Sequence, residues 1–161
     1  MDDRFHLGRF VSAQDAASTY DGAVGELRRG RKTGHWMWFV FPQIAGLGLS
    51  ALSREFAISS REEACAYLRH VILGPRLLEC TAILAERRDR TAVQMFGAVD
   101  ARKLHSSMTL FMRADQGQPL FRLVLDRYFD GSPTRRPTNG SEQRIGAAVG
   151  SATKAYHRAG A

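Results

Sequence analysis

Apolar residues recur along this chain at intervals of three and four positions, which is the spacing of one face of an amphipathic helix. The strict alternation of apolar and polar residues that typifies a half-exposed strand is rare. The apolar stripes predict helices over residues 12–29, 51–57, 61–71, 75–86, 92–96, 100–112 and 119–130. Glycine or proline separates most of these segments, so we expect six to eight short helices.

Side chains at the expected helix ends agree with these boundaries. Ser12 precedes the first stripe and an acid follows three residues later, which predicts a helix start of the capping-box type. Ser60 and Glu63 have the same spacing before a later helix. Gly30 follows two arginines and is typical of a helix end. Asp100 is the expected N-cap of the helix that carries residues 103–111.

The 161 residues suffice for one domain with a substantial core. We predict an all-α fold, with a single compact domain over residues 1–131. Residues 132–161 are rich in small and polar residues, and their large apolar side chains are Ile145, Val149 and Tyr156. These can bury too little surface to offset the entropy of ordering the segment. The sequence therefore predicts a flexible basic tail over residues 132–161.

The net charge of +7 is distributed unevenly along the chain. Residues 131–161 hold five basic residues and one acid, so the predicted domain itself is only mildly basic. The high isoelectric point is therefore weak support for nucleic-acid binding, although it does not exclude it. No apolar stretch approaches the roughly 20 residues of a membrane span, and the acidic start does not resemble a secretory signal. We expect a cytoplasmic protein that does not interact with membranes.

Motifs for metals, cofactors and nucleophilic catalysis are missing from the sequence. Cys65 and Cys80 each lie in a helical pattern without a second cysteine or a histidine at zinc spacing, and we expect both to be reduced and packed. The glycines at 30, 34, 46 and 48 do not have the spacing of a phosphate-binding or dinucleotide-binding loop. No nucleophile motif of the G-x-S-x-G type occurs. We therefore expect no cofactor and no metal, and we assign no catalytic residue.

The most distinctive segment is residues 34–43, Gly-His-Trp-Met-Trp-Phe-Val-Phe-Pro-Gln, which follows a basic turn that ends at Lys32. We interpret it as a buried extended or short helical piece that ends at Pro42. Its aromatic residues are either core anchors or the wall of a ligand pocket. His35 lies beside a glycine and between cationic and aromatic residues, so it is a candidate for ligand contact. The pattern leaves both interpretations open.

A second candidate segment is Lys103-Leu-His-Ser-Ser-Met-Thr109 on a predicted helix. Lys103, Ser106 and Ser107 fall on neighbouring rows of that helix. Together with the free N–H groups of a helix start near Asp100, they could bind an anion. The alternative is that the serines are small residues that permit close helix packing and that the lysine is solvated.

Five motifs mark the chain as a member of a larger group: Phe-Val-Ser-Ala-Gln at 10–14, Glu-Leu-Arg-Arg-Gly-Arg-Lys at 26–32, His-Trp-Met-Trp-Phe-Val-Phe-Pro-Gln at 35–43, Leu-Gly-Pro-Arg-Leu at 73–77 and Ser-Ser-Met-Thr-Leu-Phe at 106–111. With them the chain resembles a widespread family of small, mostly helical microbial proteins of unknown function that automated pipelines often mislabel "calpastatin". The resemblance covers about residues 10–131. It implies an all-α fold and no established activity, and it does not include the tail.

Three functions compete at this point. The first is binding, with or without processing, of a small phosphorylated or nucleotide-like ligand in a pocket built from the 30–43 and 103–111 segments. The second is a basic surface for nucleic acid or an acidic protein, without catalysis. The third is a structural partner without chemistry, which an exposed tryptophan patch would favour. The sequence indicates neither an enzymatic reaction nor an oligomeric state. The candidate ligand-binding residues are Lys32, His35, Trp36, Trp38, Gln43, Lys103, Ser106 and Ser107.

Overall fold

A computed structural model describes residues 3–131, and the regular structure in this range is helical apart from one isolated backbone bridge. The elements are α1 (Gly8–Asp15), η1 (Ala16–Ser18), α2 (Thr19–Arg29), α3 (Met37–Val40), α4 (Ala51–Glu55), α5 (Arg61–Arg69), α6 (Leu73–Glu86), α7 (Ala92–Ala114) and α8 (Pro119–Phe129). The prediction of a single all-α domain is confirmed. The tail predicted over residues 132–161 lies outside the described residues.

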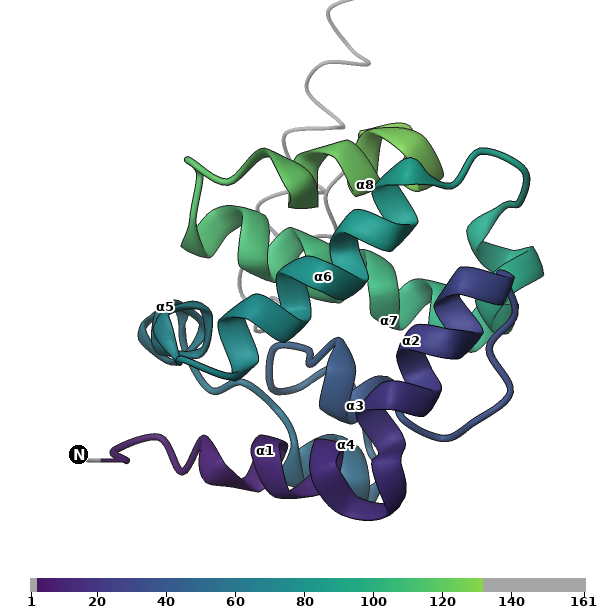
Figure 1. Cartoon of the computed structure of the whole chain (residues 1–161). Coiled ribbons are helices and arrows are strands. Elements are labelled where there is room, and N and C mark those ends of the chain that lie inside the picture. Colours follow the sequence, from purple (N-terminus) through teal and green to yellow (C-terminus); the bar gives the residue numbers. More distant parts are fainter. Residues whose placement is uncertain (1–2, 132–161) are drawn as a thin grey trace, which may run out of the picture.

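The helices form two groups (Figure 1), and one hydrophobic core joins them. The first group, α1, α2 and α3, covers the lower side of the second group in the view of Figure 1. The second group consists of α5, α6, α7 and α8, which pack against one another. The long α7 contacts both α5 and α8, and therefore runs through the centre of the second group. The largest fully buried side chains of the described residues come from most of the elements: Tyr67, Phe10, Phe41, Phe111, Phe121, Met37, Ile58, Leu73, Leu77, Leu84, Leu104 and Met108.

The first helix begins earlier than the sequence predicted. Ser12 lies inside α1 and makes no capping hydrogen bond, so the predicted helix start at Ser12 is wrong. Instead, the Asp3 carboxylate accepts hydrogen bonds from the backbone N–H groups of Leu7 and Gly8 just before and at the start of α1. Two residues with positive φ in η1 then separate α1 from α2. The stripe that predicted one helix therefore belongs to two helices with a sharp bend between them.

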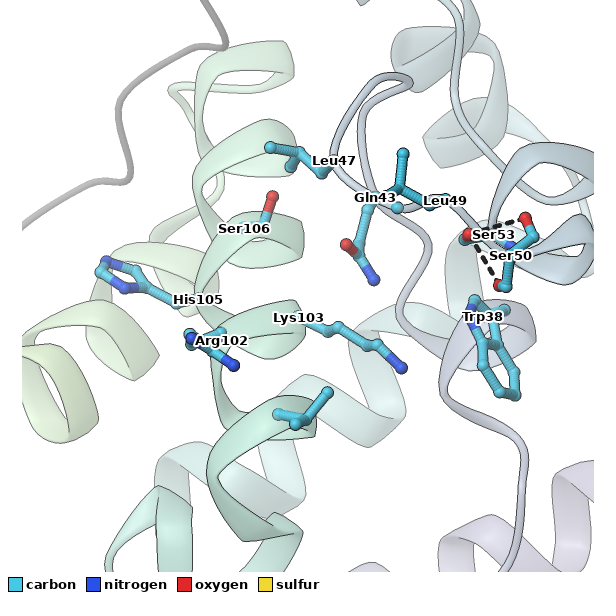
Figure 2. A pocket seen from close by; sticks show the side chains of 12 residues that line it. Trp38, Gln43, Leu47, Leu49, Ser50, Ser53, Arg102, Lys103, His105 and Ser106 are labelled. Carbon is cyan, nitrogen blue, oxygen red and sulfur yellow. Dashed lines mark hydrogen bonds between the residues drawn. The ribbon is translucent and has the colours of Figure 1, made fainter.

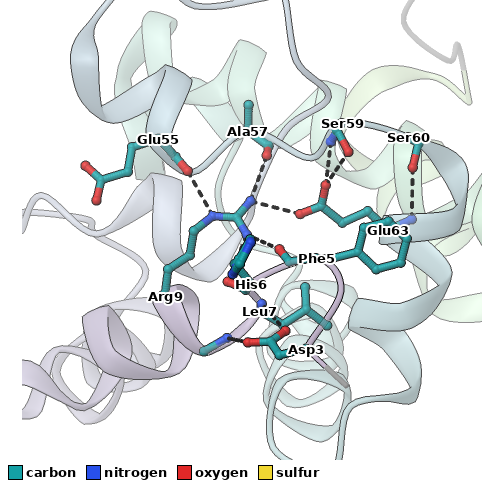
Figure 3. Close-up of polar contacts among 11 residues, drawn as sticks. Asp3, Phe5, His6, Leu7, Arg9, Glu55, Ala57, Ser59, Ser60 and Glu63 are labelled. Atoms are coloured by element: carbon teal, nitrogen blue, oxygen red, sulfur yellow. Dashed lines mark hydrogen bonds and ion pairs between the residues drawn. The ribbon is translucent and has the colours of Figure 1, made fainter. Parts of the chain in front are cut away.

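Other helix ends agree with the sequence in part. Gly30 ends α2 with a φ of 76°, as predicted. Ser60 caps α5 by accepting from the Glu63 N–H, which is half of the predicted capping box. The Glu63 carboxylate does not return to Ser60 but accepts from the backbone and hydroxyl of Ser59 and pairs with Arg9 (Figure 3). Val71, the last residue of the helix expected over residues 61–71, is 77 % exposed because α5 ends at Arg69.

Two predictions for the later helices need correction. They concern Asp100 and Pro75, whereas the predicted break between two helices at Gly97 is confirmed: α7 consists of two helical parts that meet at Gly97, whose φ of 77° and ψ of 166° are not helical. Asp100 does not cap a helix; its carboxylate binds two lysines instead. Pro75, expected at the first position of α6, is its third residue, because α6 already begins at Leu73.

The connection from α3 to α5 passes beside the middle of α7, and its backbone hydrogen bonds hold Gln43 near that helix. Phe41 and Pro42 are buried at its start. Ile44 and Ile58 then form the isolated bridge: the Ala45 N–H donates to the Ile58 carbonyl at 2.8 Å, and the Ile58 N–H donates to the Gln43 carbonyl at 2.7 Å. These bonds hold the backbone of Gln43 in place and therefore fix the position of its Cα atom.

Candidate functional site

A solvent-accessible cavity of about 690 Å³ lies between the middle of α7 and the segment that runs from α3 to α4 (Figure 2). We call it the α7 cavity. In Figure 2 the side chains of Gln43 and Lys103 extend into the space between α7 and the loop that carries Leu47 and Leu49. The cavity is lined by Trp38, Gln43, Leu47, Gly48, Leu49, Ser50, Ser53, Val99, Arg102, Lys103, His105 and Ser106.

A carboxylate shared by two lysines supports one side of the cavity. Asp100 Oδ1 lies 3.0 Å from Lys103 Nζ, and Asp100 Oδ2 lies 2.8 Å from Lys32 Nζ. Burial by itself raises the pKa of the Asp100 carboxyl, but the hydrogen bonds and charges of the two lysines outweigh it and hold this pKa below its ordinary value. Asp100 is therefore ionised at neutral pH, and the three groups together carry one net positive charge.

Each of these lysines also lies over an indole ring. Lys103 Nζ is 4.4 Å from the ring centroid of Trp38, and Lys32 Nζ is 5.1 Å from that of Trp36. Such contacts stabilise an ammonium group by about 0.5–2 kcal/mol. The Asp100 carboxylate and the Trp38 ring thus hold the charged end of Lys103 at a defined place in the cavity wall.

Two residues that line this cavity, Trp38 and Ser106, each have a donor without a hydrogen-bond partner among residues 3–131. The donors are the indole N–H of Trp38 and the hydroxyl of Ser106, and neither atom is accessible to solvent. Most buried polar groups in proteins are paired, because an unpaired one costs about 1–3 kcal/mol. An acceptor of a bound molecule or of water therefore reaches these two donors only when neighbouring side chains move.

α7 contributes two further polar residues to the cavity, Arg102 and His105. Arg102 is exposed and forms no ion pair with the described part of the chain. The His105 ring stacks on Phe129 of α8, with ring centroids 4.3 Å apart and planes inclined by 5°. This stacking fixes the plane of the imidazole at one edge of the cavity. The cavity therefore has two cationic groups, Arg102 and Lys103, on consecutive residues of one helix.

The structure brings together four of the eight candidate residues from the sequence: Trp38, Gln43, Lys103 and Ser106 all line the α7 cavity. Lys32 does not line it, but its ammonium group shares the Asp100 carboxylate with Lys103. The end of the 30–43 segment and the start of the 103–111 segment thus both contribute to the cavity, together with residues 47–53, Val99 and Arg102.

Three candidate residues lie elsewhere. His35 is exposed and outside the cavity. Ser107 is fully buried, and its hydroxyl, like that of Ser106, lacks a partner in the described range. Trp36 is 3 % exposed and packs in the core against Phe41 and Phe96. Trp38 is half-buried, so residues 3–131 present no exposed tryptophan patch. Such a patch was the observation that would have favoured a structural partner without chemistry.

The buried Trp36 has a structural role that explains the carboxylate of Glu26. This carboxylate accepts hydrogen bonds from the Trp36 indole, from the Thr33 backbone and hydroxyl, and from the Gly34 N–H. Burial raises the pKa of the Glu26 carboxyl, but these hydrogen bonds lower it by a larger amount, so the pKa is below its ordinary value. Glu26 thus holds the turn that leads from α2 into α3, and through it the position of Trp38.

Sequence reasoning did not assign Arg102, Val99 or the loop residues 47–53 to the site. Arg102 adjoins Lys103 and could have been found from that proximity. The leucines of the Gly-Leu-Gly-Leu stretch at 46–49 lie between expected helices, where no periodicity indicates which face a residue presents. Within the described chain, no group of three or more His, Cys, Asp or Glu residues could hold a metal ion.

Comparisons with known proteins agree with a family of unknown function. A family model described as "Protein of unknown function (DUF1810)" matches residues 4–140. Among solved structures, the chain is similar to the conserved hypothetical protein Rv1873 from Mycobacterium tuberculosis, with 52 % sequence identity and a TM-score of 0.80. This similarity covers 83 % of this chain and 94 % of that chain. A comparison with curated proteins finds no match. No helix of residues 3–131 has the length and hydropathy needed to cross a membrane.

Proposed function

The chain belongs to the DUF1810 family, whose description states no activity, and we propose that it binds a small phosphorylated or nucleotide-like ligand in the α7 cavity. One observation carries this proposal: Ser106 and Trp38, which each have a buried donor without a partner in the described range, line the same cavity as Lys103. Donors without acceptors next to a cation form a surface that is complementary to an anion rich in acceptor oxygens.

The charge balance of the cavity supports an anionic ligand. The Asp100 carboxylate pairs with Lys32 and Lys103, so these three groups together carry one positive charge. Arg102, which also lines the cavity, adds a second positive charge. A phosphate group carries the matching negative charge and accepts several hydrogen bonds at once. The amide of Gln43 adds a donor and an acceptor on the opposite wall.

The size of the cavity supports a ligand larger than a free anion. Ligand pockets commonly enclose about 300–1,000 Å³, and the α7 cavity of about 690 Å³ lies within that range. Leu47, Leu49, Val99 and the Trp38 ring add apolar surface to the wall of the cavity. A phosphorylated metabolite or a nucleotide combines the anionic group and the additional volume that such a cavity can accept.

The alternative function, a basic surface for nucleic acid or an acidic protein, has weaker support. Of its four basic side chains between 28 and 32, Lys32 binds Asp100 at 2.8 Å and Arg28 lies 3.7 Å from Glu79. Intramolecular acids thus reduce the charge that this run offers to a partner. This alternative predicts binding whose affinity falls steeply with salt concentration.

The test is isothermal calorimetry with nucleoside mono- and diphosphates, phosphosugars and a short oligonucleotide. We expect a metabolite to bind with modest salt dependence and Lys103→Ala to weaken it about 10- to 100-fold, because a charge-assisted hydrogen bond contributes about 1.5–3 kcal/mol. Arg69→Ala serves as the matched control, since Arg69 is an exposed cation at the end of α5, outside the cavity.

The same experiment has two contradicting outcomes. If no metabolite binds, and the oligonucleotide binds with an affinity that disappears at high salt, the basic-surface function replaces the one proposed. If a metabolite binds but Lys103→Ala and Arg69→Ala weaken it equally, the ligand lies outside the α7 cavity.

A further inference from the structure

Part of the wall of the α7 cavity is formed by apolar side chains with large exposed fractions. Leu49 is 87 % exposed, Val99 57 % and Leu47 43 %. Single exposed leucines are common on protein surfaces, but several of them around one cavity mark a surface that gains stability when something covers it. Leu47 and Leu49 come from the loop of residues 46–49, which we call the leucine loop, and Val99 comes from α7.

From this wall we infer, resting on the function proposed above, that the ligand is of the nucleotide class and that the leucine loop closes over its base. The phosphate would lie at Lys103 and Ser106, and the apolar faces of the base would be covered by Leu47, Leu49 and Val99. The loop would thus act as a lid that also selects for the base.

The position of Lys103 supports this division of the cavity. Its ammonium group lies over the Trp38 ring at 4.4 Å from the centroid, so it occupies the ring face on which a base would otherwise stack. The indole N–H of Trp38 is buried and has no partner in the described structure, so it reaches an acceptor of the ligand only when a neighbouring side chain moves. An apolar base must find its contacts elsewhere in the cavity, and the exposed leucines are the apolar groups that line it.

Hydrogen bonds hold the backbone on either side of the leucine loop, and few hydrogen bonds hold it between these points. At one end the Ala45 N–H donates to the Ile58 carbonyl at 2.8 Å, and at the other Ser50 accepts from the Ser53 N–H at 3.1 Å. Between these ends the loop has few hydrogen bonds within the described range beyond the turn at residues 45–46. A segment with few hydrogen bonds between fixed ends opens and closes at low cost in free energy, as ligand-binding lids do.

The glycines of the loop determine how it lies against α4. Gly46 has a φ of 95°, which other residues rarely adopt, and gives the loop a bend next to its fixed end. The backbone at Gly48 rests so closely on Ser53 that an added Cβ would lie 2.4 Å from the Ser53 Cβ. The loop therefore lies against the start of α4, with the Leu49 side chain exposed above the cavity.

The experiment compares three probes by calorimetry: ADP, ribose 5-phosphate and inorganic pyrophosphate. Leu49→Ser should weaken ADP about 5- to 10-fold, because a leucine then no longer covers the base. It should change the affinity for ribose 5-phosphate and pyrophosphate less than twofold, since neither has a base. Leu123→Ser is the matched control, because Leu123 is an equally apolar, 51 % exposed residue of α8 outside this cavity. Hydrogen exchange at residues 46–49 should slow with ADP and not with pyrophosphate.

The outcomes separate this inference from the function on which it rests. If ADP and pyrophosphate bind, both are weakened by Lys103→Ala, and Leu49→Ser affects them equally or not at all, the lid and the base selection are overturned while anion binding stands. If exchange at residues 46–49 does not slow with bound ADP, the lid is likewise overturned. If none of the three probes binds, both this inference and the proposed nucleotide-like ligand are overturned.

Discussion

At the scale of single residues, Asp100 organises the candidate site. Its carboxylate connects Lys32, whose side chain is 8 % exposed, with Lys103 in the cavity wall. A buried ammonium group without a counter-charge is costly, so Asp100 allows Lys32 to be buried at all. It also limits where the charged end of Lys103 can lie, which matters for any anion that binds there.

We expect Asp100→Asn to lower the free energy of unfolding by about 1–3 kcal/mol at neutral pH, because Lys32 loses its buried partner. The folded-state pKa of Asp100 is below the ordinary value of 3.8. The stabilisation is therefore present above pH 3.8 and is lost as the pH falls further. Urea unfolding at pH 7 and at pH 3 should show the difference between wild type and variant shrinking at the lower pH.

The matched control for this variant is Asp126→Asn. Asp126 pairs with Arg122 at 3.0 Å, but both side chains are about half exposed, at 51 % and 55 %. Exposed ion pairs contribute about 0–1 kcal/mol, so this substitution should change stability little. Equal losses from the two substitutions would mean that Asp100 has no special role in holding Lys32.

At the scale of elements, the bend in α7 at Gly97 separates two parts with different tasks. The part before it is capped by Thr91 and Gln94 and contributes Phe96 to the core beside Trp36. The part after it carries Asp100 and the cavity residues. The bend therefore sets the direction from which residues 99–106 meet the loop opposite. Its φ of 77° with ψ of 166° belongs to a region that glycine alone adopts readily.

We expect Gly97→Ala to lower the free energy of unfolding by about 1–3 kcal/mol, because alanine is strained at this φ and ψ. No atom lies within 4 Å of the added Cβ, so any loss reports backbone conformation and not a clash. Gly22→Ala is the matched control: Gly22 lies in α2, its Cβ would also meet nothing, and its φ is not positive. Alanine there should stabilise by about 0.5–1 kcal/mol, and thermal unfolding of both variants should show shifts of opposite sign.

At the scale of the whole molecule, Arg9 joins the N-terminal helices to the second group. Its guanidinium donates to the Phe5 and His6 carbonyls near its own helix and to the Glu55 and Ala57 carbonyls before α5. It also pairs with Glu63 at 2.8 Å, where the Glu63 side chain is 3 % exposed (Figure 3). Residues more than 45 positions apart are thus held by one planar side chain.

We expect Arg9→Ala to lower the free energy of unfolding by about 2–4 kcal/mol, because it leaves a buried carboxylate without its cation. Arg9→Lys should recover only part of this loss, since an ammonium group keeps the charge but cannot donate to all five acceptors in the guanidinium geometry. Chemical denaturation of the three proteins checks this order. Full recovery by lysine would mean that charge alone matters and that the hydrogen bonds to the carbonyls add nothing.

Much of the site could be anticipated where the signal was local, and the rest could not. Lys103 and Ser106 were found because they are close in sequence on one helix, and Trp38 because aromatic residues cluster around it. Trp36 has the same neighbours, yet it is buried, because its indole N–H meets the carboxylate of Glu26 ten positions earlier. No local pattern distinguishes two tryptophans that differ only in their distant partners.

The sequence by itself determined the class of the fold, most helix positions and the ends set by Gly30, Ser50, Thr91 and Pro119, because helix periodicity and capping act over a few residues. The tertiary structure decided the role of each polar residue. Asp100 became a bridge between lysines instead of a cap, and Glu63 a partner of Arg9. Such choices depend on which groups meet after the chain has folded, since burial makes pairing with a distant partner more favourable than leaving a charge alone.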